Sequence, residues 1–164
     1  MKDTGRILVI PDIHGCKKTL SALLKKINLR NEDTLYFLGD YIDRGPDSSG
    51  VLDIITNLQK HYENIIPLCG NHEYQILNAE KTFKKKEFYY YVKKINKSDD
   101  LLNKKKKIKK KYRKFMESLA YFAETKDYFF VHAGFDFKKD NPFEDVKSML
   151  NIRTFKYDRH KAKG

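Results

Sequence analysis

The sequence of 164 residues lacks the features that mark secreted or membrane-bound proteins. It contains only two cysteines, Cys16 and Cys69, which are too few for a framework of disulfides. No apolar run approaches the roughly 20 residues that a membrane-spanning helix needs. The N-terminal segment has a short apolar stretch but no small-residue cleavage site, so no signal peptide is predicted. We therefore expect a cytoplasmic protein with no membrane partner.

Arginine is also scarce, although the chain is strongly basic. Lysine and arginine together number 34 against 22 acidic residues, and the formal net charge is +12. Such a surplus attracts anions in general. Only six of the basic residues are arginines, whereas proteins that read nucleic acids usually place arginine on bases and phosphates. We therefore expect no specific nucleic-acid partner and interpret the lysines as a solvated surface.

Short apolar runs alternate with helical patterns in the first 70 residues. The runs lie at 6–10, 34–38 and 65–69, and apolar residues three or four apart occur at 20–27 and 51–58. This alternation predicts buried parallel strands joined by helical crossovers in an α/β fold. No internal repeat or flexible linker is present, so residues 1–164 are predicted to form one domain.

The second half of the chain predicts mainly helices. Apolar residues at helical spacing occur over 88–95 and 108–123, and we expect the lysine run 104–111 to form the wet face of the second helix's first turns. A fourth strand is predicted at 128–131, and a short helix at 143–150.

A polar cluster ends each of the four predicted strands. The clusters are DIHG at 12–15, GDYIDRG at 39–45, GNHE at 70–73 and VHAG at 131–134. The carboxyl ends of strands in open α/β sheets converge over one crevice, where ligands bind. Three of the five histidines, His14, His72 and His132, lie in these clusters.

Several of these side chains suit a pair of divalent cations. Asp12 and His14 are two residues apart, so in an extended chain they point to the same side and can share one ion. Asp40 has two oxygens and can bridge two ions, while Asn71 and His132 can complete the second. Mixed oxygen and nitrogen ligands favour manganese, iron or zinc over calcium. We expect two divalent ions, with manganese first and iron or zinc as alternatives.

The remaining polar side chains suit phosphate chemistry. Two ions about 3.5–4 Å apart can hold a hydroxide and a phosphate for in-line attack. Arg44 would neutralise phosphate oxygens. His72 would protonate a leaving oxygen, with Asp43 holding its ring in the required tautomer. Each cluster alone is compatible with a capped turn or a core histidine, but their combination at strand ends favours a metal site.

These motifs resemble those of the calcineurin-like metallophosphoesterases, and in particular the phosphoprotein phosphatases in their compact bacterial and phage form. The family's motifs run D-x-H-G, G-D-x-x-D-R-G, G-N-H-E and H-A-G, and the match covers residues 6–134. The resemblance implies a metallophosphoesterase-type β-sandwich flanked by helices. It also implies a dinuclear centre, with one ion on Asp12, His14 and Asp40, the other on Asp40, Asn71 and His132, phosphate on Arg44, and His72 with Asp43 as the general acid and its partner.

The resemblance leaves the substrate open between two classes. It predicts a phosphomonoesterase that acts on phosphoserine and phosphothreonine in proteins or on small phosphoesters. Some relatives instead cleave dinucleoside polyphosphates symmetrically, and those often read G-N-H-D and lack the second aspartate before Arg-Gly. Glu73 and Asp43 therefore favour a Ser/Thr protein phosphatase, with the dinucleoside polyphosphate hydrolase as the alternative.

The sequence also departs from the family pattern. The stretch NIRTF at 151–155 resembles a family segment that carries a second phosphate-binding arginine, which makes Arg153 a candidate, with a surface arginine as the alternative. No Gly-His pair follows Gly134, although the family uses that histidine on the second ion. We therefore expect a C-terminally incomplete domain whose last strands are missing.

An incomplete domain has two expected consequences. With three protein ligands on the second ion, the chain would retain metal weakly and turn over slowly, or would be a catalytically impaired remnant that only binds anionic partners through its lysines. Unpaired strand edges also predict self-association.

Overall fold

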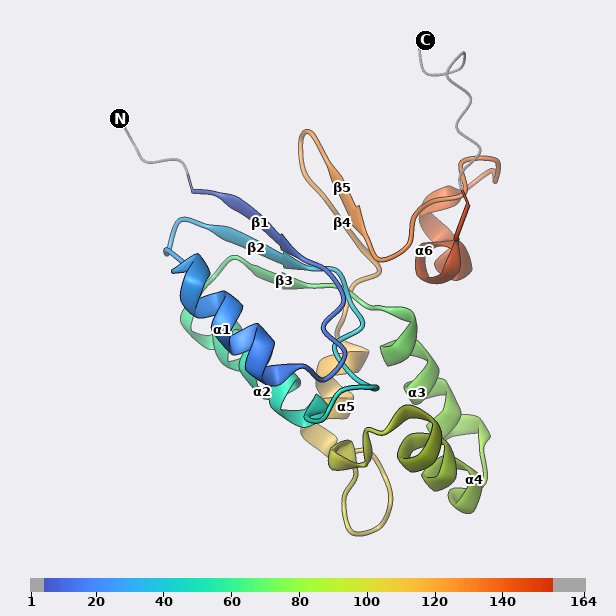
Figure 1. Ribbon diagram of the computed structural model, residues 1–164. Coiled ribbons are helices and arrows are strands. Elements are labelled where there is room, and N and C mark those ends of the chain that lie inside the picture. Colours follow the sequence, from blue (N-terminus) through green and yellow to red (C-terminus); the bar gives the residue numbers. More distant parts are fainter. Residues whose placement is uncertain (1–4, 155–164) are drawn as a thin grey trace.

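The computed structural model describes residues 5–154, and a parallel sheet forms its framework (Figure 1). Strands β1 (Ile7–Ile10), β2 (Thr34–Phe37) and β3 (Ile65–Pro67) pair in the order β1-β2-β3. Helix α1 (Lys17–Ile27) connects β1 to β2, and α2 (Ser48–His61) connects β2 to β3. The predicted α/β alternation over the first 70 residues is confirmed.

Beyond the sheet lies a group of short helices. They are α3 (Asn71–Thr82), α4 (Lys85–Tyr90), the π-helix η1 (Tyr91–Asn96), the 3-10 turn η2 (Asp99–Leu101) and α5 (Lys110–Glu117), and they lie together at the lower end of the view in Figure 1. Within residues 5–154, no helix is both long enough and apolar enough to cross a membrane.

The chain then forms a β-hairpin and a last pair of short helical elements. Strands β4 (Phe122–Glu124) and β5 (Phe129–Val131) pair antiparallel, and the 3-10 turn η3 (Pro142–Glu144) precedes α6 (Val146–Asn151). The backbone amide of Ala133 donates a hydrogen bond to the carbonyl of Met149, at 2.8 Å, which ties α6 to the segment after β5.

The two faces of the parallel sheet have different neighbours. Leu35 and Phe37 are fully buried in the main apolar core, together with Leu20 of α1 and Ile55 of α2. On the opposite face, the ring of Tyr36 stacks on Phe130 of the hairpin, with ring centroids 4.0 Å apart. The hairpin therefore packs against the face of the sheet that α1 and α2 do not cover.

The predicted helix at 108–123 is wrong at both ends. Residues 103–107 form a turn closed by a bridge between Leu102 and Ile108, so most of the lysine run precedes α5. The helix then ends at Glu117, and residues 122–124 form a strand. Phe122 and Ala123 satisfied the helical spacing, but pairing with β5 gives their backbone groups partners that an isolated pattern cannot reveal.

The prediction of β1 as a buried strand also needs correction, whereas the strand predicted at 128–131 is confirmed. Ile7 and Val9 are 53% and 43% exposed, so β1 is buried on only one of its faces. It is also an edge strand of the described sheet, and the expected self-association through strand edges stays a prediction. The strand predicted at 128–131 exists as β5, but it pairs antiparallel in a separate two-stranded sheet.

A buried carboxylate ties the start of β1 to the start of β2. The side chain of Asp33 has no exposed surface and accepts hydrogen bonds from the backbone amides of Arg6 and Arg30, both at 2.9 Å. The Arg6 side chain also donates to it, at 3.1 Å from Nε. The hydrogen bond from the Arg6 side chain is the main reason that the pKa of Asp33 lies well below its usual range, whereas burial acts in the opposite direction.

This cluster predicts how stability depends on acid. Because the pKa of Asp33 is depressed in the folded state, its contribution is present above the unfolded pKa and is lost as pH falls through the folded pKa. We expect Asp33→Asn to lower the free energy of unfolding at neutral pH and to remove part of the decline below about pH 4. Urea unfolding across that range measures both. Asp53→Asn, which removes an exposed ion pair with Lys111, should change little, and equal effects of the two substitutions would contradict this role.

Candidate metal centre

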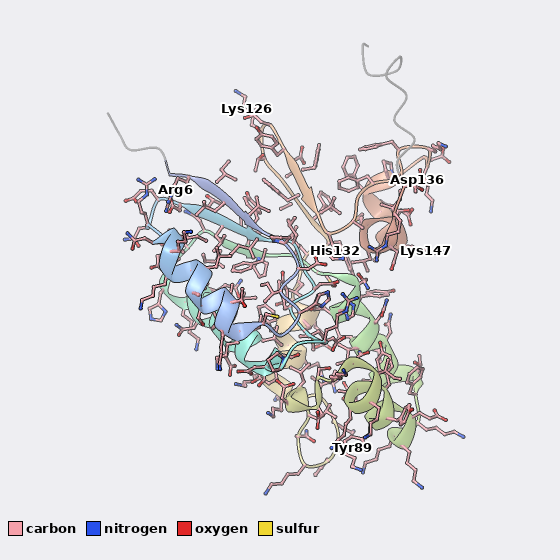
Figure 2. The ribbon with its side chains drawn as sticks, viewed as in Figure 1. Arg6, Tyr89, Lys126, His132, Asp136 and Lys147 are labelled. Carbon is pink, nitrogen blue, oxygen red and sulfur yellow. The ribbon has the colours of Figure 1, made fainter. Side chains whose placement is uncertain are left out.

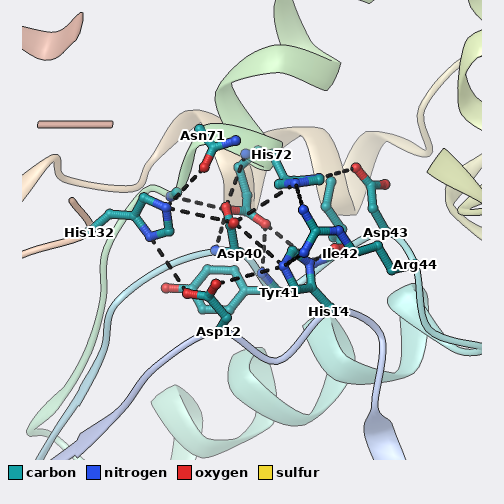
Figure 3. A network of polar contacts seen from close by, with 12 residues as sticks. Asp12, His14, Asp40, Tyr41, Ile42, Asp43, Arg44, Asn71, His72 and His132 are labelled. Carbon is teal, nitrogen blue, oxygen red and sulfur yellow. Dashed lines mark hydrogen bonds and ion pairs between the residues drawn. The ribbon is translucent and has the colours of Figure 1, made fainter. Parts of the chain in front are cut away.

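The loops that follow β1, β2, β3 and β5 meet at one edge of the parallel sheet (Figure 3). The backbone amides of Ile13 and His14 both donate to the carbonyl of Asp40, at 3.0 and 2.9 Å. A Cβ on Gly45 would lie 2.0 Å from the carbonyl oxygen of His14. The glycine is therefore required, because the first two loops pack backbone against backbone at this point.

The backbone is strained where the polar side chains gather. His14, Asp40, Asp43 and Arg44 all have positive φ angles, between 45° and 71°. For residues other than glycine, this left-handed conformation costs free energy and persists only when surrounding contacts fix it. The loops therefore need specific bracing.

Glu73 supplies that bracing from the first turn of α3. Its carboxylate is fully buried and accepts hydrogen bonds from the backbone amides of Asp40 at 2.9 Å, Tyr41 at 2.8 Å and Gly70 at 3.0 Å, with a longer one from Ile42 at 3.3 Å. Burial and then the charge of Asp40 raise the pKa of Glu73 to about 7, although the hydrogen bonds oppose this change. Its side chain fixes the loops from beneath and does not face solvent.

Two groups of metal-binding side chains share Asp40. One contains His14, Asp40 and His72, the other contains Asp12, Asp40 and His132, and the ligand atoms within each group lie within 4.8 Å of one another. The Oδ2 atom of Asp40 is 3.7 Å from His14 Nε2 and 3.6 Å from His132 Nε2. Asp40 belongs to both groups, as its predicted bridging role requires. The other members differ from the predicted ligand sets, because His72 lies with His14, and Asp12 lies with His132.

The hydrogen bonds of His14 and His132 indicate which ring nitrogens are available to bind cations. Nδ1 of His14 lies 3.0 Å from the carbonyl of Ile42, and Nδ1 of His132 lies 2.9 Å from that of Leu38. A carbonyl only accepts, so each ring carries a proton on Nδ1. Nε2 of both rings lies on the side of Asp40, and that of His14 is also close to the guanidinium of Arg44.

Three atoms that can bind a cation gather beside His132. Nε2 of His132 is 3.0 Å from Oδ1 of Asn71 and 3.6 Å from Oδ2 of Asp40. With Nε2 unprotonated, these three acceptors repel one another unless a cation lies among them. The residues present therefore fit divalent ions.

His72 has different neighbours from the other two histidines. Its Nδ1 lies 2.7 Å from Oδ2 of Asp43, and its Nε2 is 3.9 Å from Asp40 and 3.3 Å from the guanidinium of Arg44. Burial lowers the pKa of His72, but the hydrogen bond to Asp43 and the charges of Asp40 and Asp43 outweigh it, so the pKa is raised. A histidine whose ring is oriented by Asp43, with Nε2 beside Asp40 and Arg44, suits a general acid.

The partners of Asp43 include a serine that sequence reasoning missed. Ser98 donates its hydroxyl hydrogen to Oδ1 of Asp43, while His72 occupies Oδ2. The backbone amide of Asp43 donates to the hydroxyl of Ser48, at 2.9 Å. Both serines are fully buried. Ser98 follows η1, 55 residues from Asp43, and nothing in its local sequence indicates this contact.

Arg44 and Arg153 differ in their relation to this cluster. Arg44 is exposed, with Nη1 2.9 Å from Nε2 of His14, so its guanidinium borders the metal-binding groups and remains open to an anion. Arg153 is exposed after the end of α6 and forms no hydrogen bond or ion pair with these residues in the described part of the chain. The structure therefore brings together every predicted site residue except Arg153.

Comparison with known proteins identifies the family. Residues 5–163 match the profile of a family described as calcineurin-like phosphoesterases. The chain belongs to this family. The mixed α/β metallophosphoesterase fold predicted from the motifs is thus confirmed, and family membership agrees with divalent metal ions at the cluster.

Two curated relatives of this chain carry the same name. A symmetrical bis(5'-nucleosyl)-tetraphosphatase of Wigglesworthia glossinidia brevipalpis is 37% identical over 94 residues, which cover 57% of this chain and 30% of the relative. The protein of the same name from Hamiltonella defensa is 43% identical over 70 residues, covering 42% of this chain and 24% of the relative. The chain therefore matches less than a third of the length of these relatives.

Solved structures show the same fold. A protein described as a diadenosine tetraphosphatase aligns with a TM-score of 0.61 at 24% identity, covering 82% of this chain and 52% of that one. A protein serine/threonine phosphatase from Saccharomyces cerevisiae, similar to human PP5, aligns with a TM-score of 0.57 at 22% identity, covering 90% and 52%. These alignments support the fold and do not separate the two substrate classes.

The bracing role of Glu73 predicts that length and charge both matter at this position. In Glu73→Gln, an amide NH2 would face backbone amides that also donate, and we expect the free energy of unfolding to fall by about 1–3 kcal/mol. Glu73→Asp keeps the charge but is too short to reach both loops, so it should also destabilise. Urea unfolding measures these changes, with Glu117→Gln on the exposed side of α5 as the control. Wild-type stability in both Glu73 variants would show that the loops do not depend on this carboxylate.

Proposed function

We propose that this chain is a metal-dependent phosphohydrolase whose substrates are dinucleoside polyphosphates, cleaved symmetrically. The observation that carries the proposal is the placement of Asp40 between two groups of metal-binding side chains, with the exposed guanidinium of Arg44 at their border. The relatives named as symmetrical bis(5'-nucleosyl)-tetraphosphatases support the choice of substrate class.

The position of each residue in the cluster indicates its role in the proposed reaction. Asp12, His14, Asp40, Asn71 and His132 would hold two divalent ions, which supply activation of a water and neutralisation of phosphate charge. Arg44 would form bidentate hydrogen bonds with phosphate oxygens. His72 would deliver a proton from Nε2, which lies beside Arg44 and thus beside the bound phosphate.

A second candidate, Ser/Thr protein phosphatase, is favoured by one specific observation. The chain of contacts from Ser98 to Asp43 to His72 holds an oriented acid. The leaving alkoxide of phosphoserine is a strong base and needs a proton, whereas a leaving nucleoside phosphate is a weak base and needs it much less. An acid held this firmly is more useful for phosphoserine than for a phosphoanhydride.

Glu73 and Asp43 favoured protein substrates in the sequence, and the structure supports this use of only one of them. Glu73 is fully buried against backbone amides, so it does not contact a substrate of either class. It stabilises the loops, so its presence does not distinguish the two substrate classes. Asp43 still favours protein substrates, because it contacts the general acid His72 directly.

Leaving-group dependence separates the candidates. In excess Mn²⁺, we expect the chain to convert diadenosine tetraphosphate into two equal products faster than it dephosphorylates a phosphoserine peptide. His72→Asn should reduce peptide turnover by about 10²–10⁴-fold and diadenosine tetraphosphate turnover by much less. Ser98→Ala should give the same pattern with smaller losses, because it acts only through Asp43.

Controls and contrary outcomes follow from the same assay. Asp40→Asn should abolish both activities, which excludes a contaminating enzyme. Rapid turnover of the peptide with no cleavage of the dinucleotide would select the second candidate. No turnover of either substrate at saturating Mn²⁺ would overturn both candidate functions. The interpretation of the chain as a catalytically impaired remnant would then remain.

A further inference from the structure

The whole net charge of the chain resides in one segment. Residues 84–114 contain 15 basic and three acidic residues, a surplus of 12, whereas the other 133 residues carry 19 of each sign. This segment, here called the basic lobe, builds α4, η1, η2 and α5 with their connecting turns (Figure 1). Its single arginine, Arg113, forms an ion pair with Glu80, so the remaining 14 cations are lysines.

Some of these lysines are held close together. The ammonium of Lys106, in the turn after η2, lies 3.9 Å from the ring centroid of Tyr89 in α4. The ammonium of Lys93 is 5.6 Å from the same centroid and donates to the Tyr89 hydroxyl, at 3.2 Å. Two lysines 13 positions apart therefore contact one aromatic ring, and the turn places its positive charge on α4.

An apolar groove opens on the same lobe. It has a volume of about 430 Å³ and is lined by Phe83, Lys86, Glu87, Tyr90, Tyr91 and Ile95. Phe83, Tyr90 and Ile95 are 44%, 60% and 61% exposed, which is unusual for large apolar side chains on so charged a surface. The one acid in the groove, Glu87, accepts a hydrogen bond from the backbone amide of Lys84, at 3.1 Å, and so caps α4.

We propose that this groove docks an acidic segment of a partner protein through a large apolar side chain. The partner's carboxylates match the lysine surplus, and its apolar side chain matches the exposed walls of the groove. A nucleic acid matches less well, because the aliphatic side chain of Ile95 offers no ring on which a base could stack and the lobe has no free arginine fork for phosphate or base edges. The proposal goes beyond the reaction and does not depend on its substrate.

The groove is also joined directly to the catalytic loops. Ile95 lines the groove, and the carbonyl of the next residue, Asn96, accepts a hydrogen bond from the backbone amide of Arg44, at 2.8 Å. Ser98, two residues further, holds Asp43. A docked partner would therefore contact the same segment that supports the loops of the metal-binding cluster.

Peptide binding tests the proposal without metal or activity. The probe is a short fluorescein-labelled peptide of aspartate and glutamate with one central phenylalanine, followed by fluorescence anisotropy on the full chain. We expect binding that weakens as salt rises. Binding should weaken by about tenfold or more in Tyr90→Ser and in Lys86→Glu, because these changes remove a wall of the groove and a cation at its rim.

Matched variants on the hairpin serve as controls. Tyr128 is 60% exposed, as Tyr90 is, and Lys126 is an exposed lysine at the hairpin end far from Tyr89 in Figure 2. Tyr128→Ser and Lys126→Glu should leave the affinity within about twofold of wild type. Thermal unfolding of each variant confirms that the fold is intact.

Four outcomes would overturn the proposal. They are no binding of the peptide, equal binding of a peptide with serine in place of phenylalanine, unchanged binding in Tyr90→Ser, and tighter binding of a single-stranded oligonucleotide that Tyr90→Ser and Lys86→Glu both weaken. The last outcome would assign the surface to nucleic acid. Failure of the peptide assay with intact hydrolysis would reject the docking groove alone.

Discussion

The buried carboxylate of Glu73 is the constraint on which the metal-binding cluster depends. It accepts hydrogen bonds from backbone amides of two different loops, at Asp40, Tyr41 and Gly70, and so fixes their separation. Asp40 has a left-handed backbone conformation that is unfavourable on its own. The backbone amide of His72, next to Glu73, donates to Oδ1 of Asp40, at 3.1 Å, so the same turn positions both the shared carboxylate and the acid.

The rest of the molecule adds layers around this constraint. The parallel sheet brings its strand ends to one edge, and the hairpin packed on its face adds His132 there. Asp12 and His132, distant in sequence, therefore lie within 3.9 Å of each other. The basic lobe contributes Ser98, whose hydroxyl donates a hydrogen bond to Asp43. The lobe thus combines two properties, a buried hydroxyl that orients the acid and an exposed apolar groove within a lysine-rich segment. A partner that binds the groove would contact the same segment that supports the chemistry.

Sequence reasoning located the strands and most of the cluster because both have local signatures. The runs at 6–10, 34–38 and 65–69 are short, apolar and bounded by breakers, and the polar motifs follow them directly. The contact of Ser98 with Asp43 depends on the packing of a helical lobe and has no local signature. The helix expected over 108–123 failed because Phe122 and Ala123 fit a helical period, although their strand partners lie later in the chain. The charge surplus of residues 84–114 can be counted in the sequence, but the apolar groove on the same lobe required the arrangement in space.

The most direct test of the account is anomalous diffraction at the manganese edge from crystals of the full chain grown with Mn²⁺. The account predicts two anomalous peaks that share Asp40 as a ligand, one beside His14 and the other beside His132 and Asn71, and the loss of both in Asp40→Asn. Manganese bound away from Asp40, or bound equally well in Asp40→Asn, would contradict it.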